Sequence, residues 1–186
     1  MALKSTIFKA ELNVADMDRD VYADFSLTIA RHPSETDERM MLRVLAFALN
    51  ASERLEFGRG ISTENEPDLW RKSLSGEIEL WIELGTPVES RLRKACGRSA
   101  SVILYSYGGR SVPIWWEKIN RDLQRFDNLQ IFRIDDESIR QLAEMAAANM
   151  QLQCTIQDGE AMLTASLGAN HVGSANSLQI APERLL

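Results

Sequence analysis

Two acidic residues, Asp68 and Glu83, occupy positions from which they could share a metal ion. Glu83 belongs to an alternating segment, residues 77–84, in which isoleucine or leucine fills every second position. If residues 66–73 form a strand that turns back onto this segment, Asp68 lies directly opposite Glu83. Opposed residues in an antiparallel pair have Cβ atoms about 4.5–5.5 Å apart. Two carboxylates at that separation can share one cation, so the spacing predicts an oxygen-ligated Mg²⁺ or Mn²⁺ site.

Other carboxylates are alternative ligands for the same site. Residues 67–72 could equally begin a short helix, and Glu66 or Asp68 would then reach the site from a loop. Glu35 could supply a third oxygen from the first long helix, although acidic residues in a first turn commonly just complement the helix dipole. His32, which precedes that helix, could contact phosphate or lie at the surface as a capping residue.

A hydrolytic site of this kind also needs a cation that stabilises the attacking water or the charge developing on a phosphoryl group. The expected helix over residues 86–97 follows Glu83 directly. At 1.5 Å per residue, Lys94 lies about level with Glu83. Its direction around the helix is less favourable than that of Arg91, which flanks the apolar face. Both are therefore candidates for the catalytic cation.

Composition limits the classes of partner and metal. The formal net charge is −6, so nucleic-acid binding would depend on a local basic surface. Arg91, Arg93, Lys94 and Arg98 provide a basic stripe on one helix, which could also be an ordinary solvated face. Only two histidines and two cysteines occur, which disfavours zinc, and we expect Cys96 and Cys154 to be reduced thiols. No apolar run approaches the roughly 20 residues needed to cross a bilayer, and no signal peptide is recognisable, so we expect a cytoplasmic protein.

Hydrophobic periodicity predicts one α/β (α+β) domain of 186 residues with a mixed sheet flanked by helices. The second helix is expected to begin with Thr86 as its cap, and Ser34 is expected to cap the first. The Asp158-Gly159 pair predicts a hairpin. Residues 168–186 are small and polar, which is typical of a partly disordered tail. The strands are expected at residues 6–15, 21–30, 55–59, 66–73, 77–84, 100–107, 129–134, 152–157 and 161–165, and the helices at residues 34–51, 86–97 and 113–126 and from residue 136.

The order of helix, strands, helix and strand resembles the core of PD-(D/E)XK nucleases, which hold magnesium with an Asp and a Glu on neighbouring strands. Gly85 stands where their Glu-x-Lys motif has lysine. Long motifs also resemble the YaeQ family of bacterial proteins: residues 30–36 (ARHPSET), 66–70 (EPDLW), 78–87 (IELWIELGTP) and 150–159 (MQLQCTIQDG). The resemblance covers nearly the whole chain. It implies a variation of the nuclease fold, and some members of the wider nuclease superfamily carry the lysine on the following helix. The family pattern gives Glu66 a greater role than Asp68, although either could meet Glu83.

Two functions follow from these observations. The first is a magnesium-dependent nuclease or phosphodiesterase in which Glu83, with Asp68 or Glu66, binds the metal and Lys94 or Arg91 stabilises the transition state. The second is a non-catalytic module that retains the nuclease fold and binds nucleic acid or a protein. A hydrolase of small molecules has no Gly-x-Ser-x-Gly or Cys/His arrangement to support it. If Trp81 faces an open cleft, it is the best candidate for stacking on a base.

Overall fold

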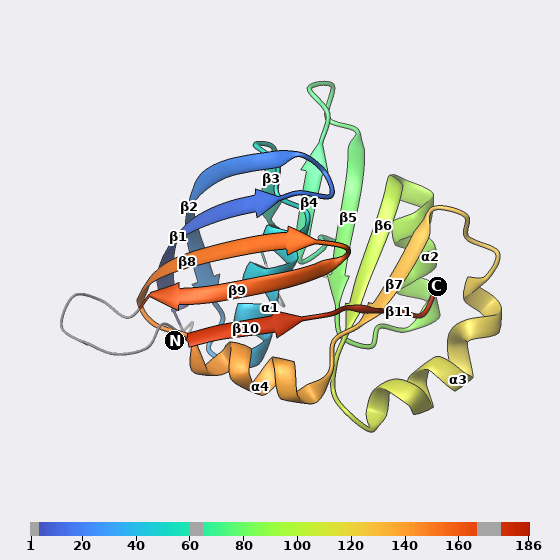
Figure 1. Ribbon diagram of the computed structural model, residues 1–186. Coiled ribbons are helices and arrows are strands. Elements are labelled where there is room, and N and C mark those ends of the chain that lie inside the picture. The colour runs from blue at the N-terminus through green and yellow to red at the C-terminus, as the bar shows by residue number, and fades with distance from the viewer. Residues whose placement is uncertain (1–3, 60–64, 167–175) are drawn as a thin grey trace.

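The computed structural model describes residues 4–59, 65–166 and 176–186 and contains two mixed sheets (Figure 1). The predicted single domain is confirmed, but its strands are divided between a five-stranded sheet of order β10-β9-β8-β1-β2 and a six-stranded sheet of order β11-β7-β6-β5-β4-β3. The expectation of a single sheet was therefore wrong. None of the helices in the described segments has the length and apolar character needed to cross a membrane.

The five-stranded sheet combines strands from the N-terminal part of the chain, β1 and β2, with strands from its C-terminal part, β8, β9 and β10. β1 pairs in parallel with β8, and each of these strands continues into its own antiparallel hairpin. The predicted Asp-Gly turn connects β8 to β9, and both turn residues have positive φ, 54° and 77°. The strands are β1 (Thr6–Asp16), β2 (Val21–Arg31), β8 (Asn149–Gln157), β9 (Glu160–Ser166) and β10 (Asn176–Ile180).

The six-stranded sheet has a parallel centre. β5 pairs in parallel with β6 and β6 with β7, whereas β3, β4 and β11 are antiparallel to their neighbours. Consecutive parallel strands are joined through helices, so the loops after β5, β6 and β7 meet at one edge of the sheet. The strands are β3 (Leu55–Phe57), β4 (Leu69–Lys72), β5 (Ile78–Leu84), β6 (Ser99–Ser106), β7 (Leu129–Arg133) and β11 (Glu183–Arg184).

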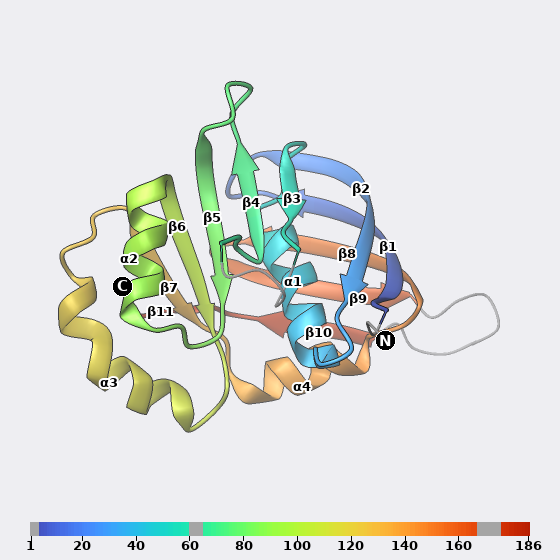
Figure 2. The same cartoon turned by 180° about the vertical axis from the view of Figure 1, so that it is seen from behind.

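Four helices complete the described part of the chain: α1 (Asp37–Leu49), α2 (Glu89–Arg98), α3 (Ser111–Leu123) and α4 (Asp136–Glu144). α1 lies between the two sheets, and α2 and α3 cover the other face of the six-stranded sheet (Figure 2). α1 and α2 begin later than expected, whereas α3 begins two residues before the expected 113 and α4 begins at Asp136 as expected. Thr36 rather than Ser34 caps α1, because its side chain accepts a hydrogen bond from Arg39 N, and α2 starts at Glu89 without a side-chain cap.

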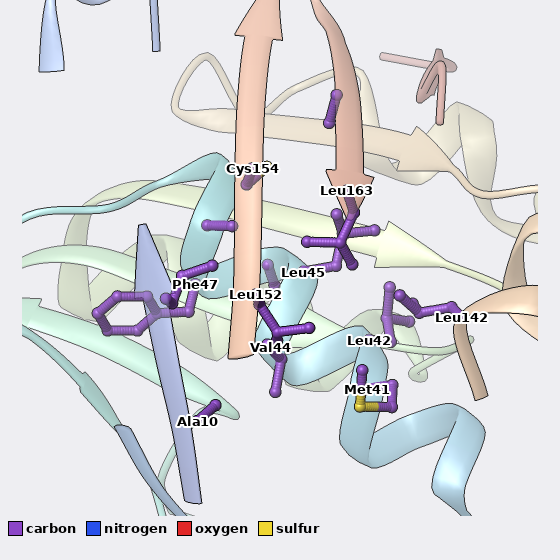
Figure 3. Close-up of a cluster of buried hydrophobic side chains, with 14 of the residues drawn as sticks. Ala10, Met41, Leu42, Val44, Leu45, Phe47, Leu142, Leu152, Cys154 and Leu163 are labelled. Atoms are coloured by element: carbon purple, nitrogen blue, oxygen red, sulfur yellow. The ribbon is translucent and has the colours of Figure 1, made fainter. Parts of the chain in front are cut away.

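The main core forms around α1. This helix is buried on nearly all sides, and its side chains Val44, Leu45 and Phe47 pack toward Leu152 and Leu163 of the five-stranded sheet (Figure 3). A second core holds α2 and α3 against the opposite face of the six-stranded sheet. The residues at the end of β5 therefore lie between two packed layers, which fixes their backbone.

The chain end is more ordered than its composition indicates. Residues 176–186, expected to belong to a partly disordered tail, form β10 and β11. Leu178 and Ile180 alternate into the main core, and β10 pairs with β9 over its full length. This pairing satisfies the backbone of a segment too polar to be recognised as a strand. Residues 168–175 of the expected tail lie outside the described residues.

Candidate functional site

β4 and β5 have the register that the sequence predicts. Leu69 pairs with Ile82, and Trp70 pairs with Trp81. One residue further along, Asp68 N donates to Ile82 O over 3.0 Å. The same register brings Asp68 to the position opposite Glu83, at the edge where the parallel strands end. Asp68 and Glu83 are both buried, each with 3% exposure.

Glu83 is held by α2 and by its own strand. Arg91 Nε lies 3.0 Å from Glu83 Oε2, and Arg91 Nη2 lies 2.9 Å from Oε1. The Trp81 indole N–H donates to Oε1 over 2.7 Å. Burial raises the pKa of Glu83 above its ordinary value, Asp68 raises it further, and Arg91 and Trp81 oppose the shift. Both carboxylate oxygens are thus occupied by N–H donors.

Asp68 is held by α1 and by the end of β5. Arg39 Nη2 lies 2.5 Å from Asp68 Oδ1, and the Leu84 N–H donates to Oδ2 over 2.9 Å. Burial raises the pKa of Asp68, with Arg39 and the Leu84 hydrogen bond acting in the opposite direction. Burial alone would lower the pKa of Arg39, but Asp68, Tyr107 and Glu35 together raise it. Arg39 is therefore a fixed cation of this site.

Glu35 lies directly before the cap of α1 and takes part in a separate buried pair. Arg43 Nη2 donates to Glu35 Oε2 over 2.9 Å, and Arg43 Nε lies 2.9 Å from Oε1. Arg39 Nε is 3.8 Å from Oε1, which links this pair to Asp68. His32 N also donates to Glu35 Oε2, while the His32 ring faces Ser34. Glu35 is therefore enclosed by arginines.

Glu66 and Lys94 lie beside the buried pairs. The Glu66 side chain accepts a hydrogen bond from Arg59 N over 3.1 Å, and its backbone carbonyl accepts one from Arg91 Nη2 over 2.9 Å. Lys94 Nζ lies 2.5 Å from Asn65 Oδ1. Of the two expected cations, the structure thus brings Arg91 to Glu83, while Lys94 contacts the segment that precedes Asp68.

The carboxylates in this arrangement do not fit a bound divalent cation. The oxygens of Asp68 and Glu83 already accept hydrogen bonds from two guanidinium groups, an indole and a backbone amide. Within residues 4–59, 65–166 and 176–186, no three His, Cys, Asp or Glu side chains gather closely enough to hold a metal ion. Mg²⁺ would have to displace both arginines before it could bind.

The structure also bears on the position of the absent lysine, Gly85, and on the proposed stacking residue, Trp81. Gly85 ends β5 with φ of 97°, a conformation that side-chain-bearing residues rarely adopt, so a lysine there would be strained. Trp81 is 2% exposed and packs at 6.5 Å between ring centroids against Trp70. It positions Glu83 through its indole N–H and is buried, so the open cleft on which a stacking role depended is absent at Trp81.

Sequence reasoning missed Arg39 as a residue of the site. The available signal was its position four residues after Glu35, a spacing typical of ion pairs in a helix, although Glu35 itself lies just before α1 in the structure. Its contact with Asp68 spans 29 residues and depends on the packing of α1 against the six-stranded sheet. No local pattern in the sequence carries that information.

The chain is similar to several bacterial proteins over almost its whole length. The family model described as "YaeQ protein" matches residues 1–173. The uncharacterized YaeQ proteins of Salmonella typhi and Escherichia coli (strain K12) are each 50% identical, over 164 residues (88% of this chain and 91% of that protein) and 159 residues (86% and 88%). These matches agree with the motifs quoted from the sequence.

Two crystal structures of YaeQ proteins have the same fold. The protein from Xanthomonas axonopodis pv. citri is 44% identical with a TM-score of 0.89, and the alignment covers 97% of this chain and 98% of that one. The protein from Pseudomonas syringae is 35% identical with a TM-score of 0.89, covering 98% and 96%. From the family match and these relatives, we conclude that the chain belongs to the YaeQ family.

Proposed function

We propose that this protein is a non-catalytic module, with a fold derived from the PD-(D/E)XK nucleases, that binds the phosphates of nucleic acid. The observation that carries the proposal is the pairing of Arg39 with Asp68 and of Arg91 with Glu83 at one edge of the sheet. The acidic partners are buried, whereas the Arg39 and Arg91 side chains remain 19% and 28% exposed. Each carboxylate can therefore orient a guanidinium toward a ligand at the edge.

The location supports a binding site. Ligands of open α/β sheets commonly bind beyond the carboxyl ends of the parallel strands. Glu83 lies near the carboxyl end of β5, which is parallel to β6, and Asp68 directly precedes the neighbouring antiparallel strand β4. Arginine recognises phosphate with a planar fork of donors, and an arginine held by a buried carboxylate loses less conformational entropy on binding. Lys94, one turn beyond Arg91, would extend this basic edge.

The placement in the nuclease superfamily rests on the same residues. An Asp and a Glu lie on adjacent strands, followed by a helix and a parallel strand, which is the arrangement expected of that superfamily. The conformation of Gly85 and the occupation of both carboxylates by arginines favour retention of the fold without cleavage.

Binding of fluorescein-labelled single- and double-stranded DNA and RNA tests the proposal. Replacing Arg39 and Arg91 together by Lys keeps both charges but removes the forked geometry, and we expect affinity to fall by about tenfold. Lys94→Gln should reduce the salt dependence by about one released counterion. Arg140→Lys, on the exposed face of α4, is the matched control. Wild-type protein that binds none of the four nucleic acids would refute the proposal.

A divalent-metal-dependent nuclease or phosphodiesterase is the second candidate function. It is favoured by the juxtaposition of Asp68 and Glu83, since Asp68 is close enough to raise the pKa of Glu83. Calorimetric titration of wild type and Glu83→Gln with MgCl₂ and MnCl₂ separates the two functions. The binding module predicts no metal binding that depends on Glu83 and no cleavage. Metal binding abolished by Glu83→Gln, together with metal-dependent cleavage, would establish the enzyme instead.

A further inference from the structure

A hollow of about 350 Å³ lies between an edge strand of each sheet, and its lining contains none of the charged residues of the carboxylate site. It is lined by residues of β2, by the end of α1 and by β3 with the residues before it, including Phe25, Phe47 and Phe57. Phe47 contacts both other rings, Phe25 edge-on at 5.2 Å and Phe57 in a stacked arrangement at 5.5 Å. The hollow thus has a continuous aromatic floor. In Figure 2, β3 lies between β4 and the strands of the five-stranded sheet.

β2 is an open edge without the usual protection. In the part of the chain that the structure describes, it pairs only with β1, through eleven residues without a shift in register. Proteins commonly protect such edges with lysine, proline, a bulge or a short strand. β2 contains no lysine or proline and has no bulge. The strand at the opposite edge, β10, is only five residues long.

The backbone of β2 presents hydrogen-bonding groups toward the hollow. The carbonyl of Ala30 accepts a hydrogen bond from Arg43 Nη2 over 2.8 Å, so it points away from β1. Alternate residues of a strand direct their N–H and C=O groups to the same side. Ser26 and Thr28, which both line the hollow, therefore direct their backbone groups to the open edge.

The rim of the hollow is acidic. Glu53 and Glu56 line it and are both exposed. The nearby Arg54 turns to Glu79 and to the carbonyl of Lys72, so it does not neutralise this rim. A second copy of the chain docked here would bring its own Glu53 and Glu56 toward those of the first. The charge therefore favours a basic partner over self-association.

We propose that this hollow binds an extended segment of another protein, with apolar residues alternating with lysine or arginine. The segment adds a strand to β2 through the backbone groups of Ser26 and Thr28. Its apolar side chains lie on the floor formed by Phe25, Phe47 and Phe57. Its basic side chains contact Glu53 and Glu56. This binding surface shares no residue with the phosphate site proposed above.

A peptide panel tests the surface. The probes are a fluorescein-labelled heptapeptide alternating Lys with Val and Phe, the same peptide with Glu in place of Lys, and the Lys peptide with alternate backbone amides methylated. We expect wild-type protein to bind only the first, as measured by anisotropy. In NMR spectra, the largest amide shifts should lie at Ser26 and Thr28. Methylation removes the donors needed for strand pairing without changing the side chains.

Charge reversal provides the matched variants. The double variant Glu53→Lys with Glu56→Lys should bind the Lys peptide with an affinity about tenfold or more lower than that of the wild type, and it should bind the Glu peptide. Glu77→Lys, at the exposed β4–β5 turn, should leave both affinities unchanged. A further variant, Thr28→Pro, removes one backbone N–H donor from the open edge of β2. The charge-reversal variants change no backbone group, so they remain informative even if Thr28→Pro fails to fold.

Three results would overturn the proposal. The first is failure of wild-type protein to bind any peptide of the panel, and the second is equal binding of the methylated and unmethylated peptides. The third is a wild-type dimer in analytical ultracentrifugation whose stability changes on Thr28→Pro or on the double charge reversal. A second copy of the chain would then occupy the hollow.

Discussion

Arg91 on α2 forms a bidentate ion pair with Glu83 at the end of β5, with Nε 3.0 Å from one carboxylate oxygen and Nη2 2.9 Å from the other. The carboxylate is buried, whereas the arginine is 28% exposed. This pair joins a helix to the strand that precedes it and neutralises a charge that would otherwise lie beside Asp68. The arginine therefore contributes to the folded state as well as to the proposed site.

Removing Arg91 should destabilise the protein more than removing an arginine from a surface ion pair, because its partner Glu83 is buried. Arg91→Met leaves Glu83 buried without a counter-charge, and we expect the free energy of unfolding to fall by about 3 kcal/mol at neutral pH. Chemical denaturation measures this change. The double variant Arg91→Met with Glu83→Gln carries neither charge, so it should recover most of the loss.

Arg93→Met is the matched control on the same helix. Arg93 is 60% exposed and lies 3.9 Å from Glu89, so we expect a loss below about 1 kcal/mol. If Arg91→Met is no more destabilising than Arg93→Met, or if the double variant recovers nothing, then the Arg91–Glu83 pair does not neutralise a buried charge.

The buried Asp68 should leave a signature in the pH dependence of stability. Burial raises its folded-state pKa above the ordinary value of 3.8, against Arg39 and the Leu84 N–H. The folded protein then holds the proton more tightly than the unfolded chain. Stability is therefore lost as pH rises from the unfolded pKa through the folded pKa. Wild type should lose stability relative to Asp68→Asn as pH is raised from about 4 toward neutrality.

Urea unfolding of both proteins at a series of pH values measures this difference. The asparagine side chain of the variant does not titrate, so the comparison isolates the contribution of the carboxyl group. A difference that instead grows in favour of wild type with rising pH would mean that Arg39 dominates and that the pKa of Asp68 is lowered on folding.

Most strands were well predicted because alternation is a local property, whereas β10 and β11 lie in the segment that was expected to be a partly disordered tail. The hairpins of β1 with β2 and of β8 with β9 follow from polar turns between alternating segments, and the register of β4 on β5 follows from the length of their connection. The division into two sheets could not be predicted this way. It depends on the parallel pairing of β1 with β8, two strands that lie far apart in the chain.

The position of Asp68 opposite Glu83 was predicted from the sequence, but the ion pairs that these carboxylates form with Arg39 and Arg91 were not part of the predicted metal site. Asp68 and Glu83 are recognisable because register and strand ends can be derived from the sequence. Whether a carboxylate faces a metal or an arginine depends on side chains of helices that come close to it only in the folded protein. Arg39 and Arg91 reach the site from α1 and α2, and the packing of these helices against the sheet cannot be derived from a local sequence pattern.

The two cysteines should be unreactive in the folded protein. Both are free thiols, and burial raises the pKa of Cys96 to about 11 and that of Cys154 to about 12. Only the thiolate is an effective nucleophile, so alkylation by iodoacetamide at pH 8 should be at least about tenfold slower than for a free thiol. Mass spectrometry with and without urea measures this. Rapid modification of Cys154 in native protein would show that β8 opens locally.

Introducing a lysine at position 85 should not create a nuclease. Gly85 has φ of 97°, and the nearest atom to an added Cβ is Tyr107 Cε1 at 3.8 Å, so the obstacle is backbone conformation rather than space. Gly85→Lys should cost about 1–3 kcal/mol of stability. Gly97→Lys is the matched control, because Gly97 lies within α2 with open space around an added Cβ. That change should be neutral or stabilising by up to about 1 kcal/mol.

Denaturation and cleavage assays with Mg²⁺ or Mn²⁺ test both variants together. Equal stability of the two would show that the end of β5 relaxes to accept a side chain. Metal-dependent cleavage gained by Gly85→Lys alone would show that Asp68 and Glu83 can release their arginines and hold a metal, which contradicts the non-catalytic function proposed above. We expect neither result. Arg39 and the Leu84 N–H contact the two oxygens of Asp68, whereas Arg91 contacts both oxygens of Glu83 and Trp81 adds a hydrogen bond to one of them. A lysine at position 85 displaces none of these four groups.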